Sequence, residues 1–305
     1  MASYGSSASA SQATPSYLIL GAGVFGASTA HHLIQKHPDA SITLVDRKRG
    51  SCEVGASWDW NKVVRADYED AFYMALALEA LDLWKDDQLY SQFFHQSGVA
   101  WVMADPEYPK KLAKNYRKLG RELDFEIIRP EELKKRYQGL FDETDFRGVG
   151  DIFLNRSSGW AEAKATVNAV IDHAVKAGVR NVSLDVASLM LDKSGVCTGL
   201  QGKNGETLCA DRIILCTGAY TAKLIADSAP GKKDIQVDHR LTAAAVTEGL
   251  FRLDPARIEK FKNGPVIVHN VGEVMGEQSE VSTYHQTKNI NILQVRQCRP
   301  PRTVS

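Results

Sequence analysis

The segment from Tyr17 to Asp46 constrains the fold of this chain more than any other. Its sequence, YLILGAGVFGASTAHHLIQKHPDASITLVD, joins a short apolar run, three glycines, a helix-like stretch and a second apolar run that ends in an acid. We predict a strand at 17–20, a helix at 26–35 and a strand at 42–45. A strand, a helix and a strand in this order form a βαβ unit, which predicts an α/β fold built on a parallel sheet.

The three glycines, Gly21, Gly23 and Gly26, have the G-x-G-x-x-G spacing, and Asp46 lies twenty residues after the last of them. The spacing alone arises by chance, but here it follows a predicted strand and opens a predicted helix. The glycines then permit a tight turn, close approach of the backbone to a pyrophosphate, and close packing of helix on strand. Free N–H groups at the start of the helix face the phosphates. We therefore predict dinucleotide binding by Gly21, Ala22, Gly23, Val24, Phe25 and Gly26.

Asp46 is expected to accept hydrogen bonds from the adenosine ribose. A carboxylate at this position repels a 2′-phosphate, which argues against NADP. Arg47 opens the basic run Arg47-Lys48-Arg49, which either softens that repulsion beside the cofactor or forms a solvated turn. We include Arg47 among the predicted cofactor residues. The glycine motif by itself leaves FAD and NAD open.

The segment DRIILCTGAY, residues 211–220, favours FAD. It is an apolar run that enters a turn of small residues, and flavoproteins of this kind use such a turn to close over the dinucleotide. Thr217, Gly218 and Ala219 are therefore predicted cofactor residues, although a tight turn without a ligand has the same composition. The short strand-like runs within 183–210 predict a three-strand meander, which is the usual insertion in such folds.

Length and composition narrow the class of protein. The 305 residues suffice for two domains, and hydrophobic and charged residues make up 44% and 24% of the chain, which is ordinary for a soluble globular protein. The formal net charge is zero, so we expect no nucleic acid partner. No apolar run approaches the roughly 18 residues that span a bilayer. The five cysteines lack a C-x-x-C pair and are expected to be buried, reduced thiols, and we predict no metal site.

Neither end of the chain reads like the rest. Residues 1–16 are small and polar and are expected to form a disordered arm, without the features of a secretory or mitochondrial signal. The segment from 278 has no steady period, and the final RTVS lacks a Ser-Lys-Leu-type address. We expect a cytoplasmic or peroxisomal protein rather than a secreted one.

On the basis of these residues, the chain resembles the D-amino-acid-oxidase superfamily of FAD enzymes. Within it, the chain is similar to the branch of monomeric sarcosine oxidase, fungal fructosyl amino acid oxidases (amadoriases) and saccharopine or pipecolate oxidases. The resemblance covers 16–277. It rests on the glycine loop with Asp46, on ASWDWNKVVRADY at 56–68, and on the segments of 159–224.

The resemblance implies a fold and a domain division. The fold is an FAD-binding Rossmann-like domain of the glutathione-reductase-2 type with an interleaved α+β substrate domain, incomplete at the C-terminus, and a monomer is expected. The implied segments are a disordered arm at 1–16, the FAD-binding domain at 17–95 and 150–230, the substrate domain at 96–149 and 231–277, and an atypical tail at 278–305.

The resemblance also implies roles for individual residues. Ser57 falls where the family contacts the flavin. Lys62 falls where a basic side chain beside the flavin ring promotes its reaction with O2, and Arg65 where a basic residue lies near the substrate carboxylate. Val186 falls where a second nucleotide-contacting strand meets the adenine. The alternatives are ordinary loop charges for Lys62 and Arg65, and a core residue for Val186.

The implied reaction is oxidation of the C–N bond of an amino acid that carries a secondary amine. The imine then hydrolyses to an aldehyde or ketone plus an amine, and O2 is reduced to H2O2. Sarcosine, fructosyl amino acids, saccharopine and pipecolate all fit as substrates. Many family members bind the flavin covalently through a late cysteine, and Cys298 is not expected to take that role. The alternatives are a non-catalytic dinucleotide-binding remnant and an NAD-dependent dehydrogenase.

Overall fold

A computed structural model describes residues 14–103, 105–122, 124–137, 139–237, 240–243, 247–270, 279–287 and 290–298. The chain divides into two compact units. The first comprises Met1–Trp58 and Val167–Thr242, and the second comprises Asp59–Thr166 and Ala243–Ser305. Across the described part of the chain, no helix has both the length and the apolar character that crossing a membrane requires.

A four-stranded parallel sheet in the order β13-β1-β2-β9 forms the centre of the first unit. β1 lies between β2 and β13, so that Leu20 at its end is level with Val45 and Leu215. The carboxyl ends of three parallel strands therefore meet at one edge, where ligands bind in folds of this class. The strands are β1 (Ser16–Leu20), β2 (Ser41–Asp46), β9 (Arg180–Ser183) and β13 (Arg212–Leu215).

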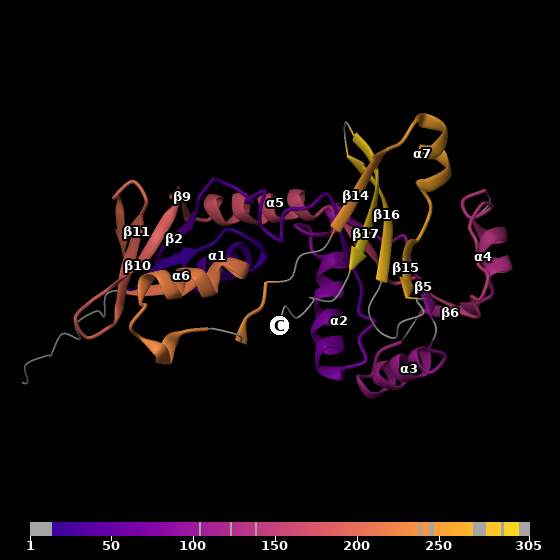
Figure 1. The fold of residues 1–305 in the computed structure, drawn as a ribbon, viewed down its shortest axis with the longest axis horizontal. Coiled ribbons are helices and arrows are strands. Elements are labelled where there is room, and N and C mark those ends of the chain that lie inside the picture. The colour runs from indigo at the N-terminus through magenta and orange to yellow at the C-terminus, as the bar shows by residue number, and fades with distance from the viewer. Residues whose placement is uncertain are drawn as a thin grey trace, which may run out of the picture. The chain divides into compact units, whose positions relative to one another are not determined.

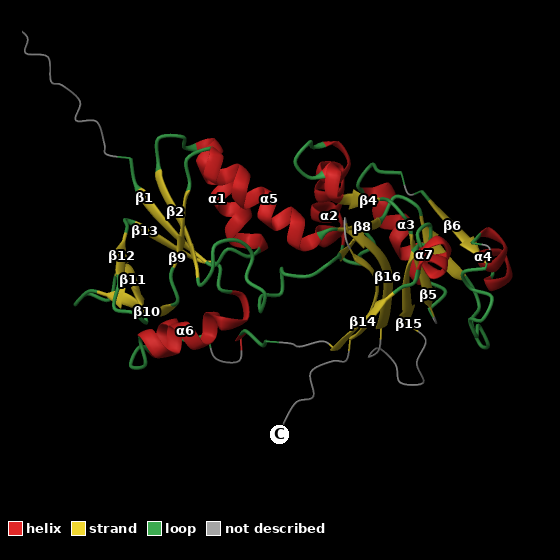
Figure 2. Cartoon of the chain, turned by 90° about the horizontal axis from the view of Figure 1, so that it is seen from above, coloured by secondary structure: helices red, strands yellow, loops and turns green. Residues whose placement is uncertain are grey.

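Different layers cover the two faces of this sheet. On one face, Leu18, Leu20 and Val45 pack against Leu200 of the meander and Leu224 of α6 (Thr221–Ser228). The meander consists of β10 (Val186–Leu191), β11 (Cys197–Gly202) and β12 (Thr207–Cys209), paired antiparallel. α1 (Val24–Lys36) and α5 (Ala163–Lys176) lie side by side on the other side of the sheet (Figure 2). This is the predicted α/β arrangement.

The second unit is built on a mixed sheet in the order β14-β17-β16-β15-β5-β7-β6. Figure 1 shows β14, β17, β16, β15 and β5 side by side. Only the β5–β15 pair is parallel among the described pairings of this sheet. The strands are β5 (Val99–Met103), β6 (Phe125–Ile128), β7 (Ile152–Asn155), β14 (Thr247–Arg252), β15 (Val266–Asn270), β16 (Ser279–Thr287) and β17 (Ile290–Cys298).

The strand β5 is buried on both faces because it is apolar at every position. Val99 and Trp101 pack with α2 (Ala71–Asp86) and α3 (Tyr108–Lys118). Ala100 and Val102 point to the opposite face and pack with α4 (Pro130–Arg136). A helix α7 (Pro255–Phe261) and a small sheet of β3 (Lys62–Val64), β8 (Gly159–Ala161) and β4 (Phe94–His95) complete the unit.

Several expectations from the sequence differ from the structure. Ser16 opens β1 rather than ending an arm, and 1–13 lie outside the described residues, as do 271–277 of the segment assigned to the substrate domain. The segment from 278 contributes β16 and β17, because backbone pairing in a sheet needs no apolar period. Cys209 is exposed and Cys216 is half-buried, so these thiols are not fully buried. Residues 59–95 and 150–166, which the resemblance assigns to the FAD-binding domain, belong to the second compact unit.

The domain boundaries themselves stay predictions. A compact unit is defined by its internal contacts, whereas a cofactor-binding domain is defined by the residues that hold the cofactor. The two definitions need not coincide in a chain that crosses three times between interleaved units.

Two leucines of α2 provide a matched test of the core of the second unit. Leu81 is 3% exposed and belongs to that core, whereas Leu76 is 50% exposed. We expect Leu81→Ala to lower the free energy of unfolding by about 2–5 kcal/mol, through lost apolar burial and the cavity left behind. Leu76→Ala should change it by about 0.5 kcal/mol or less. Denaturant titration measures both, and equal losses would contradict the packing described for α2.

Candidate functional site

The glycine loop follows β1 and is closed by contacts between backbones. Gly21 has φ +103°, and a Cβ there would lie 2.3 Å from the carbonyl oxygen of Cys216. A Cβ on Gly26 would lie 1.7 Å from the carbonyl oxygen of Gly21. Neither position accepts a side chain without displacement of the backbone, so both glycines are required by the packing of β1, α1 and β13.

Gly23 is the open position of the loop. It precedes α1 and offers no side-chain cap to the helix. A Cβ on Gly23 would meet only the Ser57 side chain, with its Oγ at 3.0 Å. Ser57 comes from a distant segment, and its Oγ accepts a hydrogen bond from the backbone N–H of Val24 at 2.9 Å. The loop thus leaves the space at Gly23 that a pyrophosphate needs, next to the positive end of a helix.

The first residues of α1 face outward. Phe25 is 77% exposed, and Val24 is also exposed. Ala22, in contrast, is buried and its backbone N–H points at Asp46. The motif therefore divides into a buried turn and an exposed helix start, and a ligand can approach only the latter.

Asp46 ends β2 beside this loop. Its Oδ2 accepts a hydrogen bond from the backbone N–H of Ala22 at 2.7 Å, and its Oδ1 accepts one from the N–H of Arg47 at 2.7 Å. These two bonds fix the carboxylate at the edge of the sheet. Each carboxylate oxygen keeps further acceptor capacity, which suits the hydroxyls of a ribose.

Arg47 connects the end of β2 to the small-residue turn. Its guanidinium carbon lies 4.9 Å from the centre of the Tyr220 ring, within the range of a cation–π contact. Its carbonyl oxygen accepts a hydrogen bond from the Ser183 hydroxyl at 3.0 Å. Arg47 is exposed and makes these two contacts, and its role at a cofactor stays a prediction.

The turn at Thr217–Ala219 lies against the glycine loop. The backbone N–H of Cys216 donates to the carbonyl of Leu20 at 2.7 Å, which joins the ends of β13 and β1. Gly218 has φ +53°, and no heavy atom lies within 4 Å of the place a Cβ would take. The turn is thus open on the side away from the loop. Parallel pairing, with the hydrogen bond from Val24 to Ser57, brings together all the predicted residues of the first unit except Val186.

Val186 lies elsewhere. It is the first residue of β10, is half-buried, and packs against the apolar cluster that contains Leu18 and Leu200. The structure gives this residue a packing role, and its contact with a cofactor stays a prediction.

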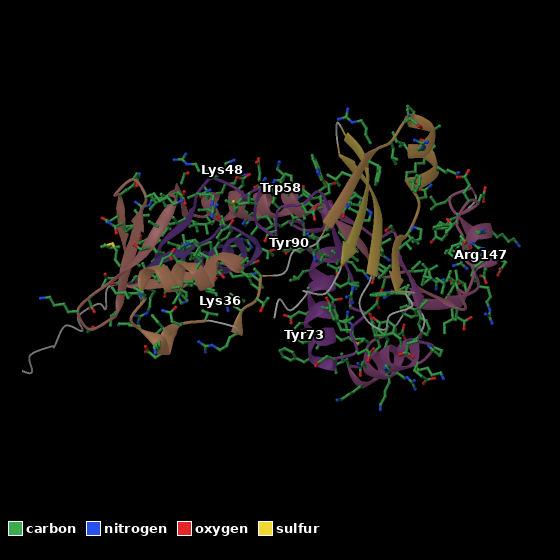
Figure 3. The ribbon with its side chains drawn as sticks, in the orientation of Figure 1. Lys36, Lys48, Trp58, Tyr73, Tyr90 and Arg147 are labelled. Carbon is green, nitrogen blue, oxygen red and sulfur yellow. The ribbon has the colours of Figure 1, made fainter. Side chains whose placement is uncertain are left out.

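The predicted basic pair belongs to the second unit. Lys62 begins β3, and its Nζ lies 2.6 Å from Oδ2 of Asp59, whose carboxyl group is buried. Its charge is therefore balanced by a neighbouring carboxylate and its position is fixed. Figure 3 marks Lys48 and Trp58 on the segment between β2 and β3.

Arg65 has a different environment from Lys62. Its Nη1 donates to the carbonyl oxygen of Asp67 at 2.5 Å. Its guanidinium carbon lies 4.4 Å from the centre of the Tyr68 ring and 4.9 Å from that of Trp101. Within the described ranges, no carboxylate lies at ion-pair distance from Arg65. Other arginines in the described part of the second unit do have acidic partners, namely Arg121, Arg129, Arg136, Arg147, Arg156 and Arg257.

Asp67 is a buried acid beside this arginine. It is 1% exposed, and its carboxylate accepts hydrogen bonds from Trp101 Nε1 at 3.1 Å and from Asn155 Nδ2 at 2.6 Å. Burial raises the pKa of Asp67, and the two hydrogen bonds and the charge of Arg65 oppose that rise. Sequence reasoning missed Asp67, Trp101 and Asn155. The one available signal was Asn155, a polar residue that ends the apolar run IFLN.

Comparison with known proteins gives a family and several relatives. The family model for FAD-dependent oxidoreductases matches residues 16–274. L-saccharopine oxidase of Schizosaccharomyces pombe is 28% identical over 265 residues, which are 82% of this chain and 59% of that protein. An amino acid oxidase of Aspergillus flavus is 28% identical over 255 residues, 70% of this chain and 53% of that protein.

One similar solved structure is the modified fructosyl peptide oxidase of Aspergillus nidulans with seven additional mutations. It superposes with a TM-score of 0.75 and 24% identity, over 95% of this chain and 65% of that one. This likeness confirms the predicted fold class. The chain thus spans between half and two thirds of the length of these three proteins.

Alanine substitutions at two glycines of the loop should have different effects on stability and on FAD binding. Gly26→Ala should lower the free energy of unfolding by about 2 kcal/mol or more, because its Cβ meets backbone. Gly23→Ala should change it by about 1 kcal/mol or less, since only a rotatable hydroxyl must move. The same variant should weaken FAD binding roughly tenfold by filling the approach to the backbone. Denaturation and FAD titration distinguish the two, and unchanged FAD affinity in Gly23→Ala would count against the loop as the pyrophosphate site.

Asp67 predicts a dependence of stability on pH. Its folded pKa lies above 3.8, so the folded chain holds this proton more tightly than the unfolded chain. We compare the free energy of unfolding of the wild type with that of Asp67→Asn. The difference in favour of the wild type should be largest below about pH 4 and should shrink as the pH rises through the raised pKa of Asp67. Denaturant titration at a series of pH values measures this difference, and a difference that stays constant with pH would overturn it.

Asp145 is the control for this pH dependence, because its pKa is shifted in the opposite direction. Its hydrogen bonds from Arg147 lower the pKa of this exposed carboxyl to about 2. The contribution of Asp145, measured against Asp145→Asn, should be present above about pH 4 and disappear as the pH falls through about 2.

Proposed function

The chain belongs to the family of FAD-dependent oxidoreductases, and we propose on this premise that it serves the oxidation of a C–N bond in an amino acid with a secondary amine. The observation that carries the proposal is Arg65, a half-buried guanidinium held in place by two rings and a carbonyl, with no acidic partner among the described residues. A fixed, unpaired guanidinium suits a substrate carboxylate. Two curated relatives matched over most of this chain are named as an L-saccharopine oxidase and an amino acid oxidase.

FAD is the cofactor of this family, and the residues of the first unit fit it. The pyrophosphate would be held at Gly23 and the N–H groups that start α1, and the ribose by Asp46. Ser57 and the turn Thr217–Ala219 would border the same cofactor. When bound, FAD supplies the acceptor for two electrons from the C–N bond and returns them to O2 as H2O2.

The protein residues supply position and charge. Arg65 would bind the carboxylate of the amino acid and so orient its α-carbon. Lys62 would place a cation near the reacting groups, and its pairing with Asp59 keeps the ammonium in one position. The amine must be neutral to lose a hydride equivalent from its α C–H. Water then hydrolyses the imine product.

The finer features rest on the family resemblance. We propose a substrate among sarcosine, fructosyl amino acids, saccharopine and pipecolate, of which saccharopine appears in the name of one relative. We also propose that the chain acts as a monomer, with O2 as second substrate, in the cytoplasm or the peroxisome.

The visible absorption spectrum of the purified chain tests the cofactor. We expect flavin bands, either as purified or after addition of FAD, and release of FAD into the supernatant on acid precipitation. Bands that stay with the precipitate would overturn the expectation that Cys298 forms no covalent link. A chain that takes up no FAD would overturn the cofactor assignment, and a chain that binds FAD but oxidises none of the candidate amino acids would favour the alternative of a non-catalytic dinucleotide-binding remnant.

Asp46→Ala should weaken FAD binding roughly tenfold or more, because hydrogen bonds to a charged acceptor are lost. Asp39→Ala is the matched control, since Asp39 is an exposed aspartate of the same unit. Equal FAD retention after dialysis in both variants would remove the ribose assignment. Oxygen consumption with each candidate amino acid then tests the reaction, and Arg65→Gln should raise KM more than it lowers kcat if its contact is made equally in ground and transition states.

A further inference from the structure

Three contacts join Arg65, Asp67 and Trp101 into a closed ring. Arg65 donates from Nη1 to the backbone carbonyl of Asp67 at 2.5 Å. The indole of Trp101 lies over the guanidinium, with 4.9 Å from its ring centre to the guanidinium carbon. The same indole donates its N–H to Oδ2 of Asp67 at 3.1 Å. Each residue therefore touches the other two, and the orientation of one restricts the others.

Neighbouring side chains hold this ring from outside. Asn155, at the end of β7, donates to Oδ1 of Asp67 at 2.6 Å and is buried. The hydroxyl of Tyr108, at the start of α3, donates to the Asp67 carbonyl at 2.9 Å. Tyr68 covers the guanidinium as well, at 4.4 Å. Both oxygens of the buried carboxylate and the carbonyl thus have donors, as a buried polar network requires.

The network leaves the charge of Arg65 available. The partners of the Asp67 carboxylate are two neutral donors rather than the guanidinium. A guanidinium has five N–H donors. Only Nη1 of Arg65 has an acceptor among the described residues. A carboxylate that paired directly with Arg65 would fill the place a ligand needs, whereas this arrangement fixes the guanidinium and keeps it open.

We propose that Asp67 and Trp101 are positioning residues, which act through Arg65 to hold its guanidinium ready for the carboxylate of a ligand. The inference rests on the carboxylate-binding role proposed for Arg65. An arginine on a surface loses side-chain freedom when it binds, and here that freedom is already lost on folding. Preorganisation by one such side chain corresponds to roughly a tenfold gain in affinity.

The alternative is that Asp67, Trp101 and Asn155 serve only the stability of the core. All three are buried, and Trp101 belongs to the apolar core of the second unit. Stability alone therefore does not separate the two roles. Affinity for a carboxylate, measured where every variant is folded, does separate them.

The experiment is a titration of the 15N-labelled chain with acetate, followed by the backbone amide signals in heteronuclear NMR for the affinity of every variant, and by the indole N–H signals for the site of binding. Acetamide, which has the same shape without the charge, is the matched ligand control. Trp101→Phe identifies the Trp101 signal and keeps an aromatic ring while it removes the donor to Asp67. Asp67→Asn keeps the shape and removes the charge. Trp84→Phe is the matched tryptophan control, because Trp84 lies on α2 and contacts Tyr90 and Phe94 instead.

We expect acetate, and not acetamide, to shift the Trp101 indole signal of the wild type. Trp101→Phe and Asp67→Asn should bind acetate roughly tenfold more weakly, and Trp84→Phe should bind it as the wild type does. Arg65→Gln should abolish the binding. Tyr108→Phe, a milder change at the same carbonyl, provides a second variant should Asp67→Asn fail to fold, and a loss of about threefold is expected for it.

The outcomes separate the two proposals. Wild-type affinity in folded Trp101→Phe, Asp67→Asn and Tyr108→Phe, together with loss of binding in Arg65→Gln, would overturn the positioning role and leave the role of Arg65 intact. Acetate binding that survives Arg65→Gln, or its absence from the wild type, would overturn the role of Arg65 and the inference with it.

Discussion

The contact between two backbones at the end of β1 is the constraint on which the first unit depends. Gly21 meets the carbonyl of Cys216, and Gly26 meets the carbonyl of Gly21, at distances that exclude any side chain. These contacts let β1, α1 and β13 converge at one edge of the parallel sheet. Asp46 arrives at the same edge from β2. Close packing of small residues therefore places a carboxylate, a helix start and an open turn around one space, as dinucleotide binding requires.

Two cationic side chains of the second unit have different kinds of partner. Lys62 has a carboxylate partner at short distance, whereas Arg65 has rings and a carbonyl in place of a carboxylate. The difference follows from Asp67, whose carboxylate is occupied by Trp101 and Asn155. Burial raises the pKa of this acid, and its two hydrogen bonds and the charge of Arg65 oppose the rise without cancelling it. Among the described residues, Arg65 therefore has no carboxylate paired directly with it.

The relatives place these local features in a larger context. Family membership identifies FAD as the cofactor, and the choice between FAD and NAD that the glycine motif leaves open is thereby decided. The chain covers 59% of L-saccharopine oxidase and 65% of the fructosyl peptide oxidase structure. Because the chain covers only part of these proteins, its activity is proposed from three observations: the family, the environment of Arg65 and the open glycine loop.

The sequence by itself determined the βαβ opening, the glycine loop, Asp46 and the small-residue turn, because local periodicity and glycine spacing encode them. It also indicated the family through the segments around Lys62 and Arg65. Only the tertiary structure decided that Val186 packs against an apolar cluster, that 279–287 and 290–298 add two strands to a sheet, and that Trp101 and Asn155 donate to the carboxylate of Asp67 beside Arg65. Trp101 and Asn155 lie 34 and 88 positions from Asp67 in the chain. No short-range pattern records such contacts, since the pairing of β5 with β7 and the packing of buried side chains bring them together.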